Sequence, residues 1–130
     1  MIDKIDYWLE LCDDDLLTAK ALFEKGRLLH MGFFCHLLAE KALKAVLSSQ
    51  TDDAPPKIHN LVTLAERSGV YDDLSEKQLQ LLEQLNPLQI EARYPEHKEV
   101  VMASFSHEKC QTIYNETEAF LCWIKQKLGK

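Results

Sequence analysis

Apolar residues recur every three or four positions along residues 2–25, which is the spacing that places side chains on one face of an α-helix. Charged residues fill the positions between them, and the segment ends before Gly26, a residue that tolerates the positive φ common at helix ends. The pattern predicts an amphipathic helix over residues 2–25. The acidic triplet at residues 13–15 is interpreted as part of its solvated face. The apolar positions are Ile2, Ile5, Trp8, Leu9, Cys12, Leu16, Ala19, Leu22 and Phe23.

Residues 28–49 are apolar at nearly every position, which is typical of a helix at the centre of a bundle. Among the polar exceptions, His36, Glu40 and Lys44 follow one another at intervals of four and therefore share one helix face. A polar stripe on a core helix is a candidate functional surface. Glu40 and Lys44 also have the spacing of a stabilising helical ion pair, so a purely structural role is the alternative.

A loop and a short helix are predicted next. Residues 48–57 combine turn-forming residues with Pro55 and Pro56, which cannot continue a helix. Four apolar residues at helical spacing then predict a short helix over about residues 59–67, ending before Gly69.

Two further helices are predicted in the second half of the chain. Ser75 and Gln78 have the spacing of a capping box and open a helix that Asn86-Pro87 should interrupt. Residues 88–104 show no clear period and are expected to form a structured crossing. Helical spacing then returns over residues 106–128, with Ser106 as the expected N-cap.

These elements predict an all-α fold. Three long and two short helices joined by short turns favour an antiparallel up-and-down bundle of about five helices. The length of 130 residues is typical of one domain, so residues 1–130 are expected to form a single helical domain.

Composition narrows the possible partners and compartments. A formal net charge of −6 argues against an extended DNA- or RNA-binding surface, which needs excess Lys and Arg. No run of 18 apolar residues and no basic leader occurs, which predicts a cytoplasmic protein that does not bind membranes. The sequence has no pattern typical of a metal site and no glycine-rich phosphate loop. Four scattered cysteines are expected to be reduced and buried: Cys12, Cys35, Cys110 and Cys122.

Two other segments carry candidate chemistry. His59 opens the predicted short helix, where free backbone N–H groups favour an anion, although a histidine there is commonly only a surface or capping residue. Arg93 and Tyr94 precede Pro95 in a constrained segment, and an arginine beside an aromatic ring suits either phosphate binding with base stacking or simple anchoring of a loop.

Taken in chain order, several short segments resemble the HEPN domain family. The segments are Trp8 with Asp-Asp-Leu-Leu-Thr-Ala-Lys at 14–20 and Gly26, Phe34 with Leu-Ala-Glu-Lys-Ala-Leu-Lys-Ala at 38–45, Ile-His-Asn-Leu at 58–61, and Ala-Arg-Tyr-Pro at 92–95. The resemblance spans residues 5–125, and its most specific part is the run at 39–44 followed by His59.

The resemblance implies a prokaryotic bundle of about five helices that often forms a homodimer and is frequently encoded beside a small nucleotidyltransferase. It implies binding of a nucleotide of the ATP or GTP class, of a nucleotidyltransferase protein, or of both. Lysine and arginine would hold phosphates, and Tyr94 would stack on a base. No cofactor is expected. The expected ligand-binding residues are Glu40, Lys41, Lys44, His59, Arg93 and Tyr94.

Many members of the wider superfamily are metal-independent ribonucleases that use an arginine and a histidine separated by four to six residues. This sequence departs from that pattern, because three residues separate Arg93 from His97 and one of them is Pro95. A non-catalytic binding module is therefore expected. The alternatives are a divergent ribonuclease using Arg93 with His97 or His59, and a dimeric interaction protein without a ligand.

Overall fold

The computed structural model describes residues 3–89 and 106–130. Within these residues the fold is all-α, which confirms the predicted class, and it contains three long and two short α-helices. The elements are α1 (Lys4–Glu24), α2 (Leu28–Gln50), α3 (Leu61–Ser68), the 3-10 helix η1 (Tyr71–Asp73), α4 (Glu76–Leu85) and α7 (His107–Lys127). The crossing expected over residues 88–104 falls largely outside the described residues.

The helix ends follow the capping signals of the sequence. Ser75 and Gln78 form both halves of the predicted capping box. Ser106 accepts a hydrogen bond from the backbone N–H of Lys109 at 3.0 Å, as expected of an N-cap. Gly26 and Gly69 adopt φ of 72° and 83°, so each supplies the left-handed backbone at which a helix stops.

One predicted helix boundary is wrong by two residues. The sequence pattern predicts a start at about residue 59, but α3 begins at Leu61, because Asn60 is its N-cap and accepts from the Thr63 N–H at 3.1 Å. His59 therefore lies in the connecting segment just before the helix, where its side chain is not constrained to a helix face.

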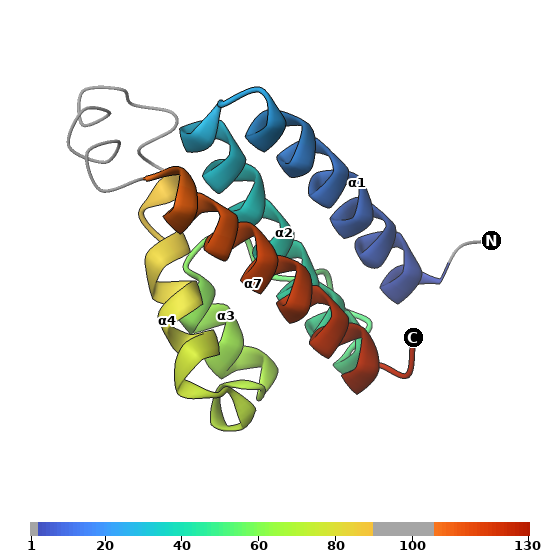
Figure 1. The fold of residues 1–130 in the computed structure, drawn as a ribbon. Coiled ribbons are helices and arrows are strands. Elements are labelled where there is room, and N and C mark those ends of the chain that lie inside the picture. The colour runs from blue at the N-terminus through green and yellow to red at the C-terminus, as the bar shows by residue number, and fades with distance from the viewer. Residues whose placement is uncertain (1–2, 90–105) are drawn as a thin grey trace.

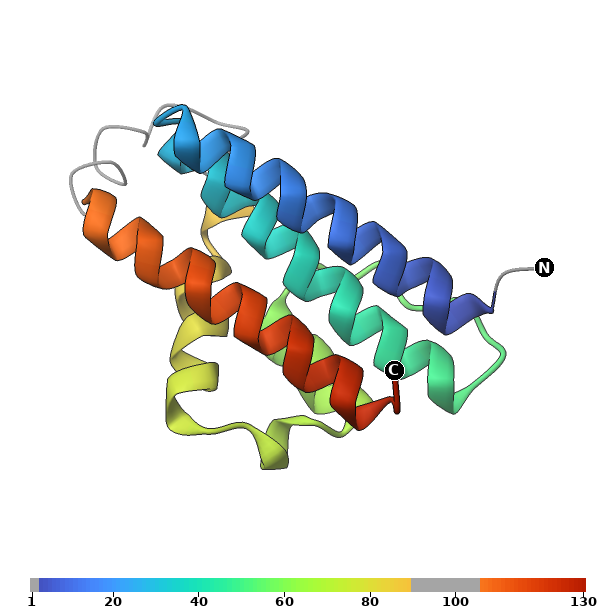
Figure 2. The ribbon, with the colours of Figure 1, turned by 45° about the vertical axis from the view of Figure 1, so that its right-hand side comes forward.

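The helix α2 lies at the centre of the bundle and contacts α1, α7, α3 and α4. Figures 1 and 2 show α1 antiparallel to α2 along its length, with α7 against the same pair and the short helices α3 and α4 on the opposite side from α1. The start of α1 lies close to the C-terminus, and the Lys130 ammonium lies 3.0 Å from the Asp6 carboxylate. None of the helices in the described ranges is long and apolar enough to cross a membrane.

The cysteines mostly follow the sequence expectation. Cys12, Cys35 and Cys110 are buried, whereas Cys122 is exposed on α7, contrary to the expectation that all four are buried. Burial raises the pKa of Cys12 and of Cys35 to about 12, so both thiols stay neutral and behave as small apolar groups.

The start of α3 is fixed to the end of α4 by side-chain amides. Asn86 follows the last residue of α4, and its Oδ1 accepts from the Leu61 N–H at 2.8 Å. Its Nδ2 also donates to Asn60 Oδ1 at 3.3 Å. These bonds satisfy a backbone N–H that a helix N-terminus leaves unpaired, and they fix the position of the segment that carries His59.

The central position of α2 predicts a large difference between two leucine substitutions. Leu43→Ala removes a fully buried side chain of α2 and is expected to lower the free energy of unfolding by about 2–5 kcal/mol. Leu17→Ala on α1 is the control, because Leu17 is 68% exposed and its loss should change stability by less than about 0.5 kcal/mol. Urea unfolding followed by circular dichroism measures both, and equal losses would contradict this packing.

Candidate functional site

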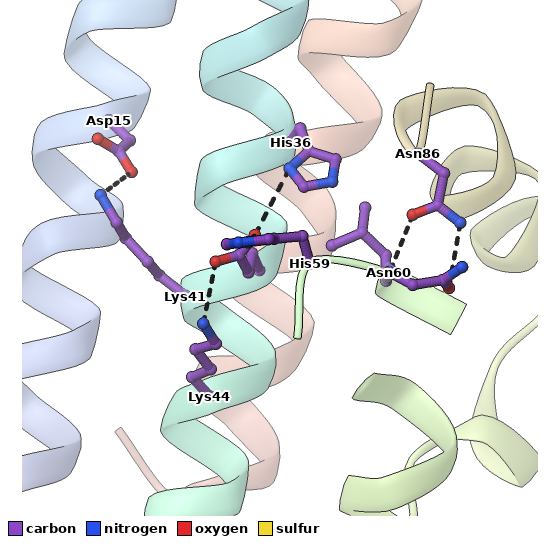
Figure 3. Close-up of polar contacts among 9 residues, drawn as sticks. Asp15, His36, Lys41, Lys44, His59, Asn60 and Asn86 are labelled. Carbon is purple, nitrogen blue, oxygen red and sulfur yellow. Dashed lines mark hydrogen bonds and ion pairs between the residues drawn. The ribbon is translucent and has the colours of Figure 1, made fainter. Parts of the chain in front are cut away.

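A buried carboxylate gathers the polar side chains of the central helix. Glu40 is only 6% exposed, and its Oε2 accepts from Lys44 Nζ at 3.0 Å. Its Oε1 lies 3.0 Å from His59 Nδ1 and 3.8 Å from Nδ1 of the buried His36 (Figure 3). We call Glu40, Lys44, His59 and His36 the Glu40 cluster.

Local and tertiary structure contribute different members of this cluster. Helical spacing alone places His36 and Lys44 one turn on either side of Glu40, as the sequence predicted. His59 comes from the segment before α3, and its position depends on the anchoring of Asn60 by Asn86. The cluster therefore joins α2 to the start of α3.

The electrostatic balance keeps Glu40 ionised. Burial raises the pKa of Glu40, but hydrogen bonds and charge from His59 and Lys44 outweigh burial and leave the pKa below its ordinary value of 4.5. Glu40 is thus an anion at neutral pH whose oxygens are both engaged, which is the condition under which a buried charge is tolerated.

His59 is the member of the cluster most accessible from outside. Its side chain is 54% exposed, whereas that of Lys44 is 11% exposed. Its Nδ1 faces Glu40, and its Nε2 makes no hydrogen bond to another residue of the described part of the chain. An incoming molecule would therefore meet the Nε2 edge of an imidazole whose other nitrogen is already held.

Lys41 does not join the cluster. Its Nζ lies 2.8 Å from the Asp15 carboxylate on α1, and Figure 3 shows it directed toward α1 while His36 and His59 lie on the α3 side. Asp15 is buried, so the interpretation of residues 13–15 as a solvated face is wrong at this position, although Asp13 and Asp14 are exposed. The reason is that Asp15 faces α2 and meets Lys41.

The ion pair between Asp15 and Lys41 does not fully offset the effect of burial on the pKa of Asp15. Burial is the largest influence on the pKa of Asp15 and raises it, the hydrogen bond and charge of Lys41 lower it, and the charge of Asp14 raises it. The pKa of Asp15 therefore lies above its ordinary value of 3.8 despite a direct ammonium partner.

Two expected site residues and one alternative catalytic residue have no described position. Arg93, Tyr94 and His97 lie outside the described residues, so the pocket predicted from them stays a prediction. The structure brings together Glu40, Lys44 and His59 of the expected set. In the parts of the chain that the structure describes, no group of three or more metal-ligating side chains is close enough to hold a metal ion.

Sequence reasoning missed the contributions of Asn60 and Asn86 to this site. The sequence pattern identifies Asn86 only as a helix breaker, because its pairing with Leu61 joins residues 25 apart in the chain. The signal for Asn60 is present in the sequence, since asparagine is a preferred N-cap, and it would have placed His59 outside the helix.

Glu40→Gln is expected to lower the free energy of unfolding by roughly 1–3 kcal/mol at pH 7, because charge-assisted hydrogen bonds to Lys44 and His59 are weakened. The pKa of Glu40 is lower in the folded than in the unfolded chain, so this stabilisation is present above 4.5 and is lost as the pH falls through the folded value. Urea unfolding between pH 7 and pH 3 measures the difference. Glu83→Gln, at an exposed position of α4, is the control, and a Glu40→Gln deficit that persists unchanged in acid would refute this account.

Asp15→Asn is expected to show the opposite pH dependence. Because the folded pKa of Asp15 is raised, the folded chain loses stability as the pH rises from 3.8 through that folded value, and a neutral asparagine avoids this loss. The stability of the variant relative to the natural chain should therefore increase over that interval, measured by the same unfolding series. Asp72→Asn, at an exposed site, should show no such trend. A relative stability of Asp15→Asn that falls as the pH rises would contradict the raised pKa.

Comparison with known proteins agrees with the fold and with the resemblance to the HEPN domain family. The sequence profile of the HEPN domain matches residues 5–127. The fold is similar to that in the crystal structure of TT1696 from Thermus thermophilus, with a TM-score of 0.80 and 18% identity over 97% of this chain and 99% of that chain. No curated protein matches the sequence. Because the profile covers nearly the whole chain, the protein belongs to the HEPN domain family.

Proposed function

We propose that this chain is a non-catalytic HEPN module that binds a nucleotide, with Glu40, Lys44 and His59 as the described part of its ligand site. One observation carries the proposal: a half-exposed imidazole is anchored through Nδ1 by a buried, ionised carboxylate. Surface histidines are usually free to rotate, whereas this ring is fixed before a ligand arrives. Preorganisation of this kind reduces the entropy cost of binding.

The charges of the cluster suit a phosphate group. Glu40 contributes one negative charge and Lys44 one positive charge, so the pair is balanced while His59 is neutral. Protonation of His59 makes the cluster a net cation with an N–H donor facing outward, and charge-assisted hydrogen bonds to phosphate are among the strongest in proteins.

Three expected ligand-binding residues are not members of the Glu40 cluster: Arg93, Tyr94 and Lys41. Arg93 would supply a planar, two-pronged donor for phosphate, and Tyr94 a ring on which a base stacks. Lys41 belongs to the neighbouring α1–α2 surface, and its ammonium becomes available to a ligand only if its bond to Asp15 is exchanged. A nucleotidyltransferase partner and a homodimer in the cytoplasm remain part of the proposal.

A thermal-shift titration against ATP and GTP tests the proposal. A ligand at a hundredfold excess over its dissociation constant should stabilise the fold by about 2.7 kcal/mol, which raises the unfolding midpoint by about 10 °C in a domain of this size. His59→Ala and Arg93→Ala should each reduce the rise. His30→Ala, on α2 but outside the Glu40 cluster, is the matched control and should retain it.

The absence of a rise with either nucleotide would contradict nucleotide binding. Co-purification with a nucleotidyltransferase, lost in His59→Ala and retained in His30→Ala, would then identify the site as a protein-binding surface. Cleavage of labelled RNA that depends on Arg93 together with His97 or His59 would instead favour the ribonuclease alternative.

A further inference from the structure

The two ring nitrogens of His59 have different surroundings, and this difference fixes where its proton lies. Nδ1 is 3.0 Å from Glu40 Oε1. An ionised carboxylate only accepts hydrogen bonds, so Nδ1 must carry a proton whether the ring is neutral or charged. The neutral ring is therefore the Nδ1–H form, with Nε2 as an acceptor that forms no hydrogen bond within residues 3–89 and 106–130.

This tautomer conflicts with an anionic ligand. A neutral His59 presents a lone pair at Nε2, which repels a phosphate oxygen, whereas a doubly protonated ring presents an N–H donor. Histidine gains and loses its proton near neutral pH, so a ligand can select the charged form at moderate cost. A phosphate at Nε2 would select the imidazolium.

The surroundings of His59 support that charged form. Glu40 lies directly against the ring, and a phosphate on the other side would place the imidazolium between two anions. The other titratable groups of the cluster, Lys44 and His36, lie on α2 and contact Glu40, and the adjacent Asn60 is neutral. Glu40 is ionised at neutral pH, since its pKa lies below the ordinary value.

We propose that binding of a nucleotide phosphate at His59 is coupled to uptake of one proton at Nε2, with Glu40 as the positioning residue that holds Nδ1–H. The inference rests on the function proposed above and specifies which part of the nucleotide meets His59. The proton comes from the solvent and stays on the ring, and no bond of the phosphate is made or broken.

Calorimetric titration with ATP at pH 7.5, in two buffers of different ionisation enthalpy, measures the protons taken up on binding. His59→Asn is the reference, because the side-chain N–H of asparagine can replace Nδ1–H toward Glu40 but does not titrate. Protons gained or lost by ATP itself are the same with both proteins, so they cancel when the two uptakes are compared. The natural chain should take up more protons than His59→Asn, up to about one per ATP, and its affinity should fall as the pH rises, by at most about tenfold per pH unit. His30→Asn should behave as the natural chain does.

The outcomes separate this inference from the proposed function. Binding of ATP with the same proton uptake in the natural chain and in His59→Asn would overturn the coupling and leave nucleotide binding in place. No binding of ATP by the natural chain would remove the coupling together with the function.

A second measurement tests the positioning role without any ligand. Long-range ¹H–¹⁵N spectra at pH 8 should show neutral His59 as the Nδ1–H tautomer in the natural chain, and Glu40→Ala should shift it toward Nε2–H. An Nε2–H tautomer in the natural chain would overturn the proposed role of Glu40 whatever ATP does.

Discussion

A carboxylate on the most buried helix of the bundle is the constraint on which the described site depends. Residues of α2 are buried against four neighbouring elements, so a charge there has lost most of its contact with water. Such a charge is costly unless every oxygen finds a donor. Glu40 meets this condition through Lys44 of its own helix and His59 of another segment, and so it links the segment before α3 to α2.

Much of the fold could be predicted from residue periodicity and capping. The central role of α2 followed from its nearly continuous apolar sequence, and the start of α4 from Ser75 and Gln78, because these signals act within one or two helical turns. The exposed Cys122 shows the limit of residue type as a guide, since cysteine is usually buried but this one lies on the outer face of α7.

The site was only partly predictable, because some of its contacts join residues close in the sequence and others join residues far apart in it. The pairing of Glu40 with Lys44 follows from a spacing of four residues, whereas Glu40 and His59 are 19 residues apart and meet through tertiary packing. Asp15 is similar: its sequence neighbours suggested a solvated face, but Lys41, 26 residues away, gives it a buried partner. Adjacent residues Glu40 and Lys41 thus serve two separate surfaces, which a pattern of residue types does not distinguish.

Because Lys44 and His59 share one carboxylate, the effect of a substitution at any of these three positions depends on the other two. If Glu40 alone were replaced by an apolar residue, the side chains of Lys44 and His59 would lose their carboxylate partner and lie against an uncharged, poorly hydrated surface. If Lys44 or His59 alone were replaced, the other would be the remaining one of these two hydrogen-bond partners of the Glu40 carboxylate. Substitutions at positions 40, 44 and 59 are therefore expected to be tolerated together more readily than singly.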